Sequence, residues 1–153
     1  MKKNTVQKGK VLTPDNQSIA IKLIAGILQC ETSHVLVNKQ GRTLSFTQLD
    51  KNKDGQLLSD VEACNQVILE ASLNDPMIDM GAVKLKCSAL ESIENHKGRD
   101  HKGLIFRGEN DVILAFIPIS TAEKRDLVVS KLHAALESYE HGKFMQPDLA
   151  GIF

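Results

Sequence analysis

The chain has 153 residues, of which 42% are hydrophobic and 25% charged, a size and balance that fit one globular domain with its own core. Basic and acidic residues number 19 each and only 4% are aromatic, so neither a positive field nor stacking side chains favour nucleic-acid binding. No apolar run approaches the roughly 20 residues of a membrane span, and the N-terminus lacks the apolar segment of a signal peptide. We therefore expect a cytoplasmic protein whose three cysteines are reduced core residues: Cys30, Cys64 and Cys87.

The first segments in chain order predict a tail, a helix and a hairpin. Residues 1–12 are polar and aperiodic, which indicates an N-terminal tail. Thr13 and Pro14 then predict a helix start, followed by apolar residues at helical spacing: Ala20, Leu23, Ile24, Ile27 and Leu28. Two short strands, 34–37 and 43–46, flank a turn in which Gly41 suits a positive φ.

The middle of the chain predicts a second helix and a half-buried strand. Ser59 and Glu62 form a capping box, and the apolar face that follows predicts a helix over 61–73. Residues 83–89 alternate apolar with polar, as a strand with one buried face does. The segment 94–102 is polar and is expected to be an inserted loop.

The last third predicts two strands and a helix. Residues 103–107 and 112–119 are strand-like and joined by a turn at 108–110. The second strand is apolar on both faces, which is typical of a central strand covered on both sides. A capping box at 120–123 opens a helix that His141 and Gly142 close, leaving 142–153 as a C-terminal tail.

This order, α-β-β-α-β-β-β-α, resembles the roadblock/LC7 family, whose fold is profilin-like or longin-like. The segments 19–45, 61–73 and 82–139 carry the resemblance, which is one of pattern and not of signature residues. It implies a single α+β domain over 13–141, with a central antiparallel five-stranded sheet and helices on both faces. The loop at 50–58, the insert and the two tails depart from the compact family form.

The resemblance also implies a function that depends on pairing. Roadblock domains typically form homo- or heterodimers through their second helix and third strand. Carried onto this chain, the dimer interface would comprise Val61, Cys64, Val67, Ile68, Ala71, Val83, Lys84, Leu85, Lys86 and Cys87. An edge strand there is a template for pairing, although the two lysines could equally keep it unpaired in a monomeric domain. The implied role is a non-catalytic dimerising scaffold or regulatory module, paired with itself or a paralogue, for a small GTPase or a signalling or motility complex.

A second reading rests on a calcium-like loop. Asp50, Asn52 and Asp54 alternate before Gly55, and Gln56 could offer its carbonyl, as in the first half of an EF-hand loop. The twelfth position, which should hold a bidentate glutamate, is a valine with acidic residues on either side. The same residues are also ordinary turn material. The alternative function is therefore a calcium-responsive binding module.

No motif indicates an enzyme. Glu94, His96, Asp100 and His101 could cluster around a metal, but histidines so placed in a polar loop are more often solvated. His34 and His133 are expected to be structural. No nucleophile motif, phosphate-cradling loop or dinucleotide fingerprint is present, so we expect no catalytic residues.

Overall fold

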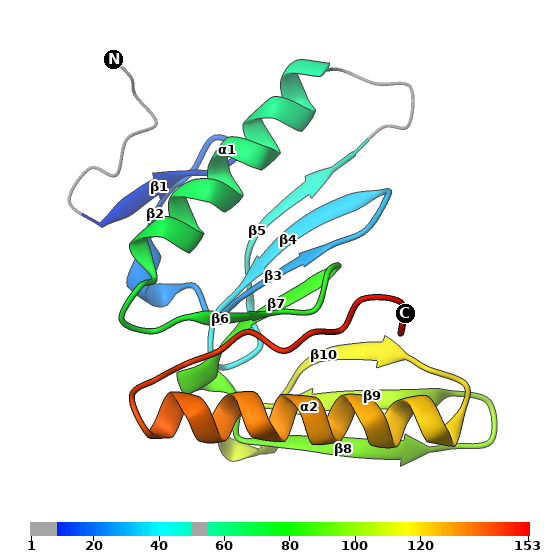
Figure 1. Ribbon diagram of the computed structural model, residues 1–153. Helices are drawn as coiled ribbons and strands as arrows, with labels where there is room; N and C mark the ends of the chain where they lie inside the picture. Colours follow the sequence, from blue (N-terminus) through cyan, green and yellow to red (C-terminus); the bar gives the residue numbers. More distant parts are fainter. Residues whose placement is uncertain (1–8, 50–54) are drawn as a thin grey trace.

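Three antiparallel sheets and two α-helices build an α+β fold in the residues that the computed structural model describes, 9–49 and 55–153 (Figure 1). The strands are β1 (Lys10–Leu12), β2 (Ser18–Ala20), β3 (Gly26–Gln29), β4 (Ser33–Val37), β5 (Thr43–Gln48), β6 (Met77–Asp79), β7 (Val83–Lys86), β8 (Ser92–Lys97), β9 (Lys102–Arg107) and β10 (Ile113–Pro118). The helices are α1 (Gly55–Ala71) and α2 (Ala122–Glu140). Within the described ranges, neither helix is long and apolar enough to cross a membrane.

The largest sheet has five antiparallel strands in the order β5-β4-β3-β7-β6, which confirms the α+β class and a five-stranded antiparallel sheet. The strands expected at 103–107 and 112–119 are not part of it, because β9 and β10 belong to a separate three-stranded sheet. Helix α1 covers one face (Figure 1), where alternate residues of the strands meet its apolar stripe. We call this cluster the α1 core: Val11, Ile21, Ile24, Ile27, Leu36, Cys64, Ile68 and Met77. The expected β4–β5 hairpin is also present, with Gly41 at φ +78°.

The second cluster, the α2 core, joins the other face of this sheet to a three-stranded sheet of order β10-β9-β8. Strands β6 and β7 supply Ile78 and Leu85, and β9 supplies Leu104 and Phe106. Helix α2 adds Val128, Leu132 and Ala135, all at most 4% exposed. In Figure 1 this helix lies across the three-stranded sheet at the base of the molecule.

The predicted first helix is wrong, and with it the order α-β-β-α-β-β-β-α, because residues 13–29 form a turn, β2, a short 3-10 helix and β3. Ile27 faces the α1 core while Leu28 faces the α2 core. Both faces of β3 are therefore apolar, which imitates a helical spacing. The Thr13–Pro14 pair begins a hairpin turn in which the Thr13 hydroxyl accepts a hydrogen bond from the backbone N–H of Gln17 at 2.9 Å.

Two further predictions for the C-terminal half are wrong. Residues 94–97 of the expected insert belong to strand β8, which pairs in register with β9. Strand β10 is an edge strand and β9 is central, so the apolar residues on both faces of β10 are not both covered. Ile113 is 53% exposed and Phe116 38%.

The helix starts and the strand at 83–89 differ from expectation in detail. Helix α1 begins at Gly55, so Ser59 lies inside the helix and does not cap it. The N-cap of α2 is Thr121, whose side chain makes no capping bond. Strand β7 ends at Lys86 and continues as a 3-10 turn over Cys87–Ala89.

Both segments expected as tails carry structure. Lys10–Leu12 of the N-terminal segment is β1, which pairs with β2 and buries Val11. The segment 142–153 has no helix or strand, yet Leu149 is only 9% exposed and belongs to the α2 core. It runs between the two larger sheets in Figure 1.

Candidate functional site

The residues predicted to form a dimer interface are mostly interior. The buried members are Val61, Cys64, Ile68, Val83, Leu85, Lys86 and Cys87, while Val67, Ala71 and Lys84 retain partial or full exposure. Strand β7 is not an edge, since β3 pairs with one side of it and β6 with the other. Pairing through this surface would require the protomer to open, and the lysines of β7 protect no edge.

The predicted metal ligands Asp50, Asn52 and Asp54 lie outside the described residues. Gln56 lies in the first turn of α1, where its amide donates to Asp60 at 2.8 Å. Among described residues no group of three His, Cys, Asp or Glu side chains is placed to hold a metal. His96 instead sits on β8 and contacts Glu94 at 3.2 Å, while Arg107 donates to the same carboxylate at 2.9 Å.

Each edge strand of the five-stranded sheet is bonded by a side chain from another segment. At the β5 edge, the Asp15 carboxylate accepts the Ser45 hydroxyl at 2.8 Å and the backbone N–H of Phe46. Burial raises the pKa of Asp15, but these bonds and those from Thr13 and Gln17 outweigh it and hold the pKa below its usual value.

At the β6 edge, Gln146 imitates a paired strand. Its amide nitrogen donates to the Met77 carbonyl at 2.6 Å, and its amide oxygen accepts the Asp79 N–H at 3.0 Å. These are the two bonds that a neighbouring strand would make. Because paired or covered edges do not recruit another strand, the three-residue β6 edge is not a free template, and the β5 edge is protected at Phe46.

The three-stranded sheet has two outer strands of opposite character. Strand β8 carries Glu94, His96 and Lys97, and charged residues protect an edge from pairing. Strand β10 has the sequence Ile-Leu-Ala-Phe-Ile-Pro and no charge. In the described part of the chain its backbone hydrogen bonds go to β9 alone. Strand β10 is therefore an apolar edge whose outward backbone groups have no hydrogen-bond partner among residues 9–49 and 55–153.

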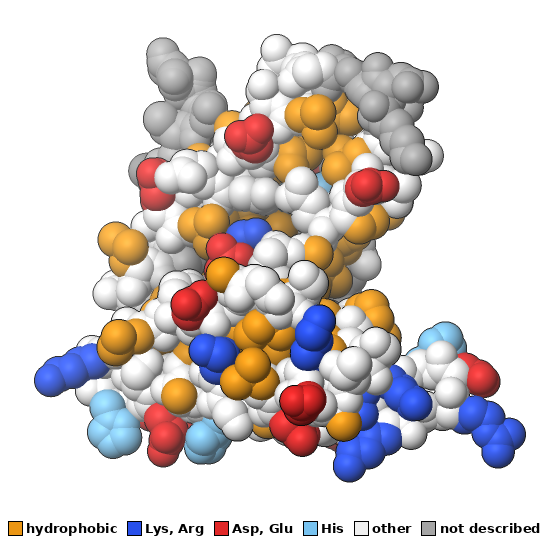
Figure 2. All heavy atoms as spheres, turned by 45° about the vertical axis from the view of Figure 1, so that its right-hand side comes forward, with side chains coloured by type: hydrophobic (Ala, Val, Ile, Leu, Met, Phe, Trp, Pro, Cys, Tyr) orange, Lys and Arg blue, Asp and Glu red, His pale blue; other side chains and the backbone are white. Residues whose placement is uncertain are grey.

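A groove of about 480 Å³ lies beside this edge. Its walls are the β6–β7 turn, the end of β10, the start of α2 and the chain's last residues, Ile152 and Phe153. Lys124 is the cation that lines it. Figure 2 shows hydrophobic side chains gathered between the upper and lower parts of this side of the molecule, with Lys or Arg side chains beside them. The site combines hydrogen-bonding backbone, an apolar floor and one positive charge.

Beneath α1 lies a layer of buried polar side chains. Asn65 of α1 donates to Gln29 at 3.0 Å, and its amide oxygen lies 2.8 Å from His34 Nε2. Since an amide oxygen only accepts, Nε2 carries the proton and Nδ1 is an acceptor. Nδ1 has no hydrogen-bond partner among described residues, nor has the hydroxyl of Thr47, the residue opposite on β5. Burial, opposed by the Asn65 bond, lowers the pKa of His34.

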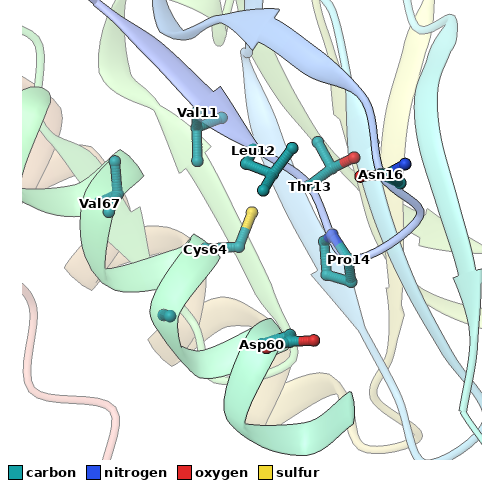
Figure 3. A pocket seen from close by; sticks show the side chains of 9 residues that line it. Val11, Leu12, Thr13, Pro14, Asn16, Asp60, Cys64 and Val67 are labelled. Atoms are coloured by element: carbon teal, nitrogen blue, oxygen red, sulfur yellow. The ribbon is translucent and has the colours of Figure 1, made fainter. Parts of the chain in front are cut away.

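A cavity of about 180 Å³ separates the β1–β2 hairpin from α1, with Cys64 pointing toward Leu12 and Thr13 (Figure 3). Burial raises the pKa of Cys64 to about 12, so its thiol stays protonated and is a poor nucleophile. Cys30, by contrast, is exposed and not a core residue. Hydrogen bonds from Ser33 and Thr32 lower its pKa to about 7.

The continuous apolar run of β10 is visible in the sequence, but such a run is typical of a central strand and so predicts the wrong position in the sheet. The uncharged edge could have been found only by knowing that β8 lies on the far side of β9. Comparisons with protein-family models, with curated proteins and with solved structures found no match for this chain.

Proposed function

We propose that the chain is a non-catalytic binding module that receives an extended segment of a partner protein along β10. The unpartnered outer edge of this uncharged strand, beside an apolar groove, carries the proposal. Strand addition supplies main-chain hydrogen bonds for affinity, and pockets for alternate side chains supply specificity. This keeps the expected binding role and moves it from β7 to β10.

The groove defines the chemistry of the partner segment. Its apolar walls, among them Phe116 and Ile117 of β10 and Phe153 at the chain end, favour apolar side chains at alternate positions. Lys124 lies two residues after Ala122, where α2 begins, and a helix N-terminus favours negative charge. The segment should therefore carry an aspartate or glutamate at the end that reaches α2.

The proposal depends on neither the predicted dimer nor the calcium-responsive alternative. A second copy of β10 is one possible occupant of the edge, whereas the β7 surface is already paired on both sides. A small GTPase remains the target that the family resemblance implies. The calcium-responsive alternative depends on residues 50–54, which lie outside the described ranges.

The test selects peptides from a displayed random library on the full chain. We expect sequences with alternating apolar residues and one terminal acid. Phe116→Pro removes an N–H that points away from β9, as the bond from the Ile119 amide to Lys102 at 3.0 Å and the alternation of the ladder indicate. It should weaken binding by at least about tenfold, whereas Phe116→Ala keeps the N–H and should cost less.

Phe46→Ala is the control, because Phe46 is also an exposed aromatic on an outer strand, at 53% against 38% for Phe116, but its N–H is bonded to Asp15. It should leave peptide affinity unchanged. Light scattering on the free chain identifies the other occupant: a dimer that Phe116→Pro dissociates would place a second copy on β10. No selected peptides and no such dimer, or peptides insensitive to Phe116→Pro, would contradict the proposal.

A further inference from the structure

Within the part of the chain that the structure describes, Lys86 is buried with no carboxylate in ion-pair contact. Its residue is 7% exposed, and its Nζ donates to the Ile21 carbonyl at 3.1 Å. An ammonium has three N–H donors, so one carbonyl does not satisfy it. In the described ranges no carboxylate lies within 4.0 Å of Lys86 Nζ.

The nearest acid is held elsewhere. Asp75 lies close enough to Lys86 to favour its charged form, but its carboxylate accepts the Ser88 hydroxyl at 2.6 Å and the Ser88 N–H at 3.3 Å. Tyr139 makes a further hydrogen bond to it. Asp75 is therefore bonded within the turn after β7, and the Ile21 carbonyl is the hydrogen-bond partner that the described residues give the ammonium.

Lys86 lines a cavity of about 520 Å³ between the start of β1, the 3-10 turn after β2 and the end of α1. Two further lysines, Lys10 and Lys22, line the same cavity and are exposed. Asp75 is the acid among the lining residues, so positive charges exceed negative ones there. Lys39 adds repulsion at Lys86 from outside the lining.

We propose that this cavity binds a small oxyanion, the chemistry that inorganic phosphate shares with a phosphate monoester, with Lys86 at its floor and Lys10 and Lys22 at its rim. A buried charge without a partner is costly, and an anion beside it restores the missing ion pair. Charge-assisted N–H bonds to phosphate oxygens are among the stronger hydrogen bonds in proteins. The site is independent of the β10 groove and of the function proposed for it.

Proton linkage gives this site a distinctive signature. Burial, with repulsion from Lys39, lowers the pKa of Lys86 despite the attraction of Asp75. A bound anion favours the ammonium and raises the pKa again, so binding should take up protons.

The experiment titrates the full chain with inorganic phosphate and with glycerol phosphate at constant ionic strength, following affinity by calorimetry and the thermal midpoint. We expect a higher midpoint with ligand, and at least about tenfold weaker binding in Lys86→Met. Lys84→Met is the matched control, because Lys84 lies on the same strand but pairs with Asp79 at 3.6 Å outside the cavity. It should bind as the unaltered chain does.

Sulfate, which does not titrate near neutral pH, serves to measure proton uptake in buffers of different ionisation enthalpy, between about pH 7 and the ordinary lysine pKa of about 10.4. Uptake that disappears in Lys86→Met supports the site. The double variant Lys10→Met/Lys22→Met changes only exposed side chains and should also weaken binding, which keeps the test decisive where Lys86→Met does not fold.

Tighter binding of glycerol phosphate than of phosphate would assign the site to an ester, and equal affinities would assign it to the free ion. Binding that is equal in Lys86→Met, in the double variant and in Lys84→Met would show an adventitious ion only and overturn the proposal. Absence of binding and of proton uptake in the unaltered chain would overturn it as well.

Discussion

The α1 and α2 sides of the molecule bury different kinds of side chain. On the α1 side the sheet buries Thr13, His34, Ser45, Thr47 and Lys86 next to the apolar residues of the α1 core. On the α2 side the described part of the chain buries one charged side chain, Arg125, which donates to Asn95 at 2.8 Å and to two carbonyls at 3.0 Å. The α2 core is otherwise apolar.

The two sides are therefore stabilised by different contributions to the free energy of folding. Apolar burial supplies most of the favourable free energy of folding, so the α2 core should dominate stability. Buried polar groups contribute little net free energy when bonded and cost free energy when left without partners. On the α1 side, the chain from Gln29 through Asn65 to His34 fixes how the helix sits on the sheet.

The largest expected effect comes from truncating the α2 core. Leu132 is fully buried, and Leu132→Ala should lower the free energy of unfolding by about 2–5 kcal/mol through lost transfer energy and a cavity. Urea denaturation measures it. Leu127→Ala, on the same helix at 46% exposure, is the control and should stay within about 0.5 kcal/mol. A loss at Leu132 no larger than at Leu127 would break the assignment of stability to this core.

The pH dependence of stability tests the buried polar groups on the α1 side. The pKa of His34 is below its usual 6.5 in the folded state, so the unfolded chain binds its proton first as the pH falls. The free energy of unfolding that this pKa difference contributes is fully present above about pH 6.5. It is lost as the pH falls toward the folded-state pKa, with a slope of at most about 1.4 kcal/mol per pH unit. Asp15, with a pKa below its usual 3.8, titrates in a separate, more acidic window.

Denaturant midpoints measured across that range should show the slope in the unaltered chain and a smaller slope in His34→Gln. The glutamine amide can still donate toward Asn65, which keeps the variant close to the original structure. Equal slopes in the two proteins would mean that His34 is not buried as a neutral ring.

The smallest effect concerns two hydroxyls on β5. Thr47 Oγ1 is buried and has no hydrogen-bond partner in the described ranges, so Thr47→Val should leave stability unchanged or raise it by up to about 1 kcal/mol. Ser45 donates to Asp15 at 2.8 Å, so Ser45→Ala should lower stability by about 1 kcal/mol. Thermal unfolding compares them. A loss at Thr47→Val comparable to that at Ser45→Ala would show that its hydroxyl is bonded.

Sequence reasoning succeeded where one local pattern decided the structure. The β4–β5 hairpin follows from Gly41, and both helices from their apolar periodicity. It failed at residues 13–29, where a strand covered on both faces has the same apolar spacing as a helix. Gly26 was the available signal, because glycine is unfavourable inside a helix and in a strand often marks a close approach; a Cβ there would lie 2.6 Å from Leu85 Cδ2 and 3.1 Å from the Lys84 carbonyl oxygen.

The candidate sites were hidden for a different reason. The order of strands in the whole sheet decides which strand is an edge. The prediction placed β7 at an edge and β10 in the centre, whereas in the structure β7 is interior and β10 is an edge. The Lys86 cavity unites residues from β1, the turn after β2 and β7, and no local spacing connects them. Alternation suggested that Lys86 would be solvated, whereas its face of β7 lies under α1.

Gln146, which bonds the outer edge of β6, is synthesised long after the strands of that sheet. The β6 edge that it closes is complete once residue 86 has been made and β7 can pair with it, yet the amide that seals it comes 60 positions later in the chain. During translation the nascent sheet therefore passes through an interval with an open border, when neighbouring nascent chains can add to it. The C-terminal segment acts as the final closure of the sheet, and messages that end before Gln146 should yield chains that fold locally but associate.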